Sequence, residues 1–140
     1  MPVSIYLLPT EPSGLRKHRL FLWANNEKIP VGEFLKDLRK SRPKDAFKLV
    51  SLFDKAAGLE RITNPEHFKA VEGHKPLFEF KAHGVRIYCF FDGRDIILVE
   101  GDFKKTDKSS AGNKQSIARA GERARLYWED KKANRVEVSE

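Results

Sequence analysis

Apolar residues between positions 31 and 57 recur every three or four residues, which is the spacing of a helix with one buried face. This spacing predicts a first helix over residues 31–38 and a second from Lys44 to Gly58. The expected core stripe of the second helix is Phe47, Val50, Phe53 and Ala57, with Ala46 and Leu49 beside it. Because only Ser41-Arg-Pro43 separates the two helices, we expect a helical hairpin.

From Leu77 onwards the apolar period changes to two, which is typical of strands. The pattern predicts strands over 77–81, 85–91 and 96–99. Ala82-His-Gly84 is the first expected turn. Asp92-Gly93 is the second, because glycine tolerates the positive φ that tight hairpin turns require. Three strands joined by two such turns form an antiparallel meander.

The two ends of the chain carry further elements. Arg19–Trp23 reads as the first core strand, and residues 1–16 read as an extra strand, over Val3–Leu8, or an arm. A last helix is expected, with a buried stripe of Ile117, Ala120, Ala124 and Tyr127 and with Ser109, Ser110 or Asn113 as cap. Residues 132–140 are a polar tail that we expect to fray.

These elements predict a single α+β domain over residues 1–140. A helical hairpin would pack on one face of a small antiparallel sheet, followed by a C-terminal helix. The other face of the sheet would then be available for a ligand.

Charge narrows the class of partner. The chain of 140 residues has a formal net charge of +7. Such an excess of positive charge on a small domain favours a polyanionic partner such as nucleic acid. The alternative is that the surface lysines only keep the protein soluble.

Other features of the composition speak against several classes of protein. Cys89 is the one cysteine and is expected to be a buried small hydrophobe, which fits the reducing cytoplasm. The four histidines are scattered, so we expect neither a metal site nor a cofactor. No apolar run approaches the ~20 residues of a membrane span. Met1–Leu8 lacks the basic flank of a signal peptide.

Four segments of the chain carry a resemblance to a known family: Val31-Gly-Glu-Phe-Leu35, Leu77-Phe-Glu-Phe-Lys81, Val85-Arg-Ile-Tyr88 with Phe90-Phe91-Asp92-Gly93, and Gly101-Asp-Phe-Lys-Lys-Thr106 with Lys108. In this order they resemble the RelE/ParE toxin superfamily, and within it the HigB-like, phage-derived group. The resemblance spans roughly Lys17 to Trp128. The chain departs from the group at Lys81, where arginine is common, and by Asp102 between Gly101 and Phe103.

The resemblance implies a type II toxin that a cognate antitoxin, a small helix-turn-helix protein, neutralises. RelE- and HigB-like members enter the ribosome and cut messenger RNA, which makes the protein a candidate ribosome-dependent endoribonuclease. Two alternatives stay open. ParE-like members inhibit DNA gyrase without nuclease chemistry, and the chain could also be a phage-derived RNA-binding module without catalysis.

RNA cleavage through the 2′-hydroxyl needs a base, an acid and positive charge beside the phosphorus. Arg86 is the candidate for charge stabilisation, or else a cross-strand partner of Glu79. Lys81 could hold phosphate or move a proton, and Glu79 could be the base or a structural ion pair. His83 could be an acid or base, although a histidine in a turn is more often only exposed.

A second group of residues is a candidate RNA-binding surface. Lys104, Lys105 and Lys108 form a basic tract after the last strand, and Lys114 would extend it along a nucleic-acid backbone. The alternative for all four is a solvated loop. Tyr88 shares a strand face with Arg86, where it could stack on a base or pack in the core.

Overall fold

The structure is a computed structural model that describes residues 2–10, 18–58, 64–104 and 113–140. Over these residues the protein is α+β, with three helices and one seven-stranded, mostly antiparallel sheet. The strands are β1 (Ser4–Leu7), β2 (Arg19–Ala24), β3 (Phe68–Ala70), β4 (Phe78–Ala82), β5 (Val85–Asp92), β6 (Asp95–Phe103) and β7 (Glu137–Ser139). The helices are α1 (Pro30–Ser41), α2 (Pro43–Ala57) and α3 (Lys114–Lys132).

The central part of the sheet is the expected meander. β4, β5 and β6 pair antiparallel in sequence order, and the turns between them contain His83, at φ 54°, and Gly93, at φ 61°. The sheet is larger than the sequence indicated, with strand order β3-β4-β5-β6-β2-β1-β7. The connection from β2 through the helical hairpin leads to β3 at one edge of the sheet, and the following strands run back to β6, which lies parallel to β2.

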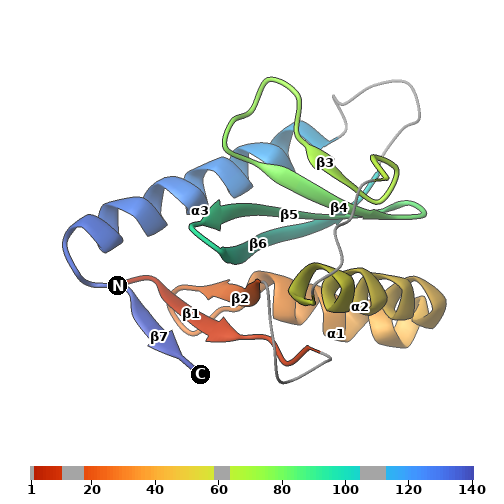
Figure 1. The fold of residues 1–140 in the computed structure, drawn as a ribbon, viewed down its shortest axis with the longest axis horizontal. Helices are drawn as coiled ribbons and strands as arrows, with labels where there is room; N and C mark the ends of the chain where they lie inside the picture. The colour runs from red at the N-terminus through yellow and green to blue at the C-terminus, as the bar shows by residue number, and fades with distance from the viewer. Residues whose placement is uncertain (1, 11–17, 59–63, 105–112) are drawn as a thin grey trace.

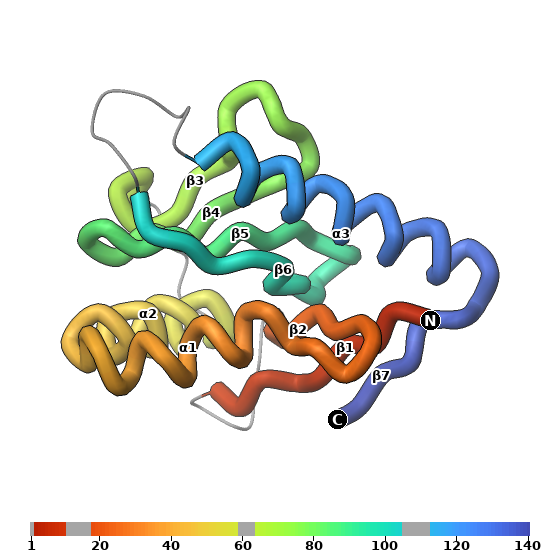
Figure 2. Tube along the Cα trace, turned by 180° about the vertical axis from the view of Figure 1, so that it is seen from behind, coloured from red at the N-terminus to blue at the C-terminus, as the bar shows by residue number. Residues whose placement is uncertain are grey.

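Helices cover both faces of the sheet. α1 and α2 lie side by side against one face, and α3 crosses the other (Figure 1). The view from behind shows the same three layers (Figure 2). The face that was expected to be available for a ligand is therefore partly covered by α3, because the apolar stripe of α3 also needs a surface on which to be buried.

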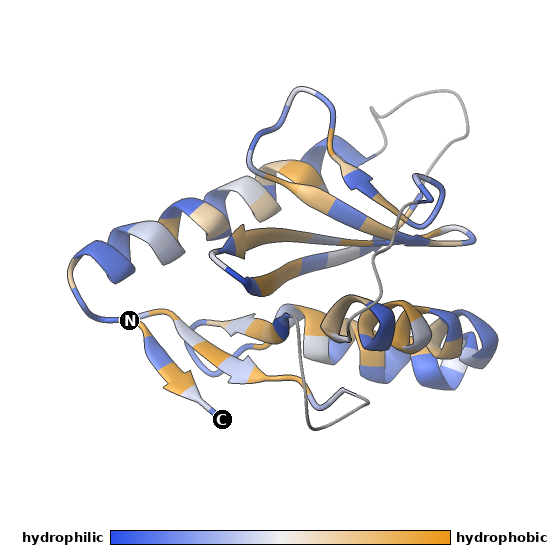
Figure 3. Cartoon of the chain, in the orientation of Figure 1, coloured by the Kyte–Doolittle hydropathy of each residue, from blue (hydrophilic) through white to orange (hydrophobic). Residues whose placement is uncertain are grey.

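Two hydrophobic clusters result, one on each side of the sheet. Alternation along β5 divides its residues between them. Ile87 and Cys89 face the helical hairpin, whereas Tyr88 and Phe90 face α3. Figure 3 shows the resulting contrast between the largely hydrophobic central strands and the mostly hydrophilic α3. The expected stripe of α3 is confirmed, since Ile117, Ala120, Ala124 and Tyr127 are all buried.

The predicted core stripe of α2 was partly wrong. Phe47 is 77% exposed and Val50 is 43% exposed. The buried face of α2 instead consists of Ala46, Leu49, Leu52, Phe53, Ala56 and Ala57, together with Asp45. The helix carries two adjacent apolar stripes, and periodicity cannot tell which of them meets the sheet.

The two termini pair with each other at one edge of the sheet. β1 is the extra strand expected within residues 1–16. The tail does not fray, because β7 pairs parallel with β1 and Arg19 bonds Glu140 at 2.5 Å. The end of α3 is held beside the same strand, since the main-chain N–H of Val3, just before β1, donates to Asp130 of α3 at 2.7 Å.

One glycine allows α1 to approach β6 closely. A Cβ at Gly101 would lie 2.6 Å from Cδ2 of Phe34, a ring that packs against Phe103. We expect Gly101→Ala to lower the free energy of unfolding by ~1–3 kcal/mol, because the ring or the strand would have to move. Urea unfolding measures this loss. Gly121→Ala is the control, since nothing lies within 4 Å of its added Cβ. It should instead raise the free energy of unfolding by ~0.5–1 kcal/mol.

Candidate nucleic-acid interface

A groove of about 930 Å³ lies where β3 and β4 meet the N-terminal end of α3. It lies on the face of the sheet that α3 partly covers, and charged side chains line it beside Val71, Tyr88, Ile117 and Ala118. Five cationic side chains line it, together with two carboxylates and one histidine. They are Lys69, Lys81, Arg86, Lys104, Lys114, Glu72, Glu79 and His74.

A β-bulge in β6 adds a carboxylate to this sheet face. Tyr88 pairs with Glu100 but Cys89 pairs with Leu98, so Val99 is an extra residue in β6. A bulge reverses the alternation of the side chains that come after it. Glu100 therefore faces α3, where Arg119 bonds it at 2.5 Å.

Arg86 is buried and held on several sides. Its Nε lies 3.3 Å from a carboxylate oxygen of Glu79. Its Nη1 donates to the carbonyl oxygens of His83 and Val85, at 3.1 and 3.0 Å. The cross-strand pair considered from the sequence is thus present, and Glu79 is part of an ion pair that keeps the guanidinium in place. Both side chains still line the groove.

The surroundings of Lys81 in the groove disfavour its protonated form. Partial burial, followed by the charges of Lys69 and Arg86, lowers the pKa of the Lys81 ammonium below its ordinary value of 10.5. A lysine with a lowered pKa is a better proton acceptor near neutral pH than an exposed one. Its position opposite Arg86 in the β4–β5 register keeps the two groups on one face.

Hydrogen bonds bring the exposed Lys104 and Lys114 to the rim. The main-chain N–H of Lys104 donates to the carbonyl of Gly84 at 2.7 Å. The amide of Asn113 donates to the carbonyl of Phe103 at 3.1 Å, which joins the start of α3 to the end of β6. Asn113 is thus at the N-cap position, as expected, but its side chain bonds β6 and not α3.

Two residues of the predicted basic tract, Lys105 and Lys108, lie outside the described residues, as do Ser109 and Ser110. Lys104 and Lys114, on either side of that segment, line the groove.

Two of the predicted site residues are held by other contacts. Tyr88 borders the groove but is only 2% exposed and belongs to the core beneath α3, which favours the packing role considered from the sequence. His83 does not line the groove. Its Nδ1 lies 2.5 Å from Asp45, which also pairs with Arg42 at 2.6 Å, so its ring turns towards α2.

Three titratable residues of the groove were not predicted as site residues from the sequence. Lys69 comes from β3, and Glu72 and His74 come after it. β3 has only three residues and alternates too briefly for a period to be seen. The sequence signal that could have located β3 is the aromatic residue Phe68. In the fold it pairs with Phe80 of β4, and the centroids of the two rings lie 4.8 Å apart.

Comparisons with protein-family models, curated proteins and solved structures find no significant match. The resemblance to the RelE/ParE superfamily thus rests on the motifs of the sequence. Within the described ranges, no three histidine, cysteine, aspartate or glutamate side chains come together to hold a metal ion. In the same ranges, no helix has the length and apolar character needed to cross a bilayer.

The lowered pKa of Lys81 predicts a pH-dependent cost to folding. The cost is fully present at neutral pH and disappears as the pH rises from the folded-state pKa to the ordinary value of 10.5. We therefore expect Lys81→Met to raise the free energy of unfolding at neutral pH, and the part of this gain that comes from the ammonium charge to be lost by the time the pH exceeds 10.5. Urea unfolding at both pH values measures the gain. Lys55→Met is the control, because Lys55 is exposed on α2 and its replacement should leave the free energy of unfolding at neutral pH nearly unchanged.

Proposed function

We propose that this protein is an endoribonuclease of the type II toxin kind, resembling RelE and HigB, that cuts messenger RNA on the ribosome. The observation that carries the proposal is the basic groove, in which Lys81, Arg86 and Lys104 share one face. Such a groove suits a single-stranded RNA backbone, because cations can follow its phosphates without reading the bases. The net charge of +7 favours approach to the ribosome.

Each side chain in the groove has a part in the proposed step. Lys81 in its unprotonated form, which the lowered pKa makes more accessible, accepts the proton of the 2′-hydroxyl, whose oxygen then forms a bond to the adjacent phosphorus. The bond from phosphorus to the 5′-oxygen breaks, and the ammonium of Lys104 donates a proton to that oxygen. Arg86, fixed by Glu79, stabilises the charge on the phosphorane oxygens. The products are a 2′,3′-cyclic phosphate and a 5′-hydroxyl end.

The motifs support the remainder of the proposal. The helical hairpin, the meander and the segment from Gly101 to Lys108 occur in the order that the toxin group has. A toxin of this group requires an antitoxin, so the proposed partners are the ribosome with its messenger RNA and a cognate antitoxin, in the cytoplasm.

The cleavage proposal predicts new 5′ ends inside translated reading frames after the protein is induced in cells. We expect Lys81→Met to reduce them about a hundredfold or more, because it removes the proposed base but keeps the shape. Lys81 is a more informative position than Arg86, since loss of Arg86 would leave the buried Glu79 unpaired. Lys132→Met, on α3 away from the groove, should cleave normally. Intact transcripts with gyrase-cleaved DNA would identify a gyrase inhibitor instead.

Phosphate binding can be tested apart from cleavage. The double variant Lys104→Ala, Lys114→Ala should bind single-stranded RNA more weakly, and the slope of log affinity against log salt should fall by about 0.7 for each lysine. Fluorescence anisotropy over a salt series measures this slope. Lys55→Ala with Lys132→Ala removes the same charge elsewhere. Equal slopes for the two double variants would contradict the assigned interface.

A further inference from the structure

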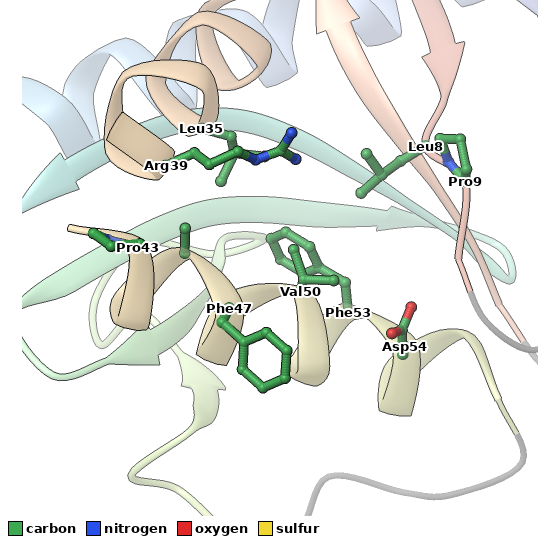
Figure 4. A pocket seen from close by; sticks show the side chains of 10 residues that line it. Leu8, Pro9, Leu35, Arg39, Pro43, Phe47, Val50, Phe53 and Asp54 are labelled. Carbon is green, nitrogen blue, oxygen red and sulfur yellow. The ribbon is translucent and has the colours of Figure 1, made fainter. Parts of the chain in front are cut away.

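A second groove, of about 520 Å³, lies on the opposite side of the sheet, along the helical hairpin. Figure 4 shows Phe47 and Val50 of α2 on one wall, Leu35 and Arg39 of α1 on the other, and Leu8 after β1 at the far end. Its lining is predominantly apolar. It shares no residue with the basic groove, so a role for this second groove does not rest on the proposed function.

Two large apolar side chains of this groove, Phe47 and Val50, are exposed to solvent. Phe47 is 77% exposed, more than any other large hydrophobic side chain that the structure describes. Val50, one turn further along the same helix, is 43% exposed. Apolar side chains that are grouped in a concave surface, and not scattered, are typical of a protein-binding site, and an aromatic residue is a common anchor.

The groove offers side chains but few main-chain groups. Its walls are helices, whose N–H and carbonyl groups are largely bonded within each helix. At the far end, the N–H of Leu8 already donates to the carbonyl of Leu20 at 2.8 Å, and Pro9 has no N–H. A partner strand would find nothing to pair with. A partner helix satisfies its own main chain and presents apolar side chains at three- and four-residue intervals, which suits such a groove.

Charges around the groove favour an acidic partner. Arg39 lines it, with exposed Lys40 beside it on α1. Lys44 is exposed one turn before Phe47 on α2. A carboxylate, Asp54, lines the groove further along the same helix. A partner helix would therefore carry acidic side chains mainly at the end that meets Arg39.

We propose that the α1–α2 groove binds an acidic amphipathic helix of a partner protein, with Phe47 as its apolar anchor and Arg39 as its charged contact. A second copy of this chain suits the groove less well, because it would bring the same cations into contact with each other.

The test uses a labelled peptide of about 18 residues, with leucine at helical spacing and glutamate at the flanking positions. A second peptide replaces every glutamate by lysine. We expect the full-length protein to bind the acidic peptide with a dissociation constant on the order of 10 µM, and to bind the basic peptide at least about tenfold more weakly. Fluorescence anisotropy measures both constants.

Two variants locate the binding. Phe47→Ser should weaken binding of the acidic peptide at least about tenfold. Because the Phe47 side chain is exposed, this substitution should leave the thermal unfolding temperature nearly unchanged. Val138→Ser, an exposed apolar residue on β7, is its control and should bind normally. Arg39→Glu should weaken the acidic peptide about fivefold or more, whereas Lys132→Glu, with the same change in net charge, should not.

Three results would overturn the proposal. The first is failure of the acidic peptide to bind. The second is an unchanged dissociation constant, either when the basic peptide replaces the acidic one or when Phe47→Ser replaces the original protein. The third is a dimer in sedimentation that Phe47→Ser converts to a monomer, which would make a second copy the occupant. None of these results bears on RNA cleavage, so the two proposals can fail separately.

Discussion

The extra residue in β6 is the constraint on which both faces of the sheet depend. β6 lies between β5 and β2, so its side chains determine what each helical layer can pack against. Before the bulge, Ile97 faces α3 and Leu98 faces the hairpin. After it, Gly101 lies under Phe34 and Glu100 faces α3. Without the extra residue this register would reverse, placing carboxylates against the hydrophobic hairpin.

Ion pairs between α3 and Glu100 help to set the position of α3 on the sheet, and so the part of the sheet that α3 does not cover. Arg119 and Arg123 both bond the buried Glu100, and Arg123 also donates to the carbonyl of Val99 at 2.7 Å. A buried carboxylate with two guanidinium partners fixes position more than it adds stability. Beyond this contact the sheet face is polar. Arg86 with Glu79 forms the floor of the groove that we propose for RNA.

The two proposed surfaces occupy opposite faces of one sheet. The basic groove uses β3, β4, β5 and the start of α3, and the apolar groove uses α1 and α2. A partner seated on the hairpin would leave the basic groove accessible to RNA.

The sequence by itself determined the elements with strong local signals. Alternation and the Asp92-Gly93 turn identified the meander, and helical spacing identified the hairpin and the buried stripe of α3. It also brought Lys81, Arg86 and Glu79 to one face, because alternation is a local property. Only the tertiary structure decided the features that depend on long-range contacts. These are the parallel pairing of β2 with β6, the Val99 bulge, the tail bound to β1, and the rotation of α2 that leaves Phe47 outside. Each depends on residues distant in the chain, which no local period encodes.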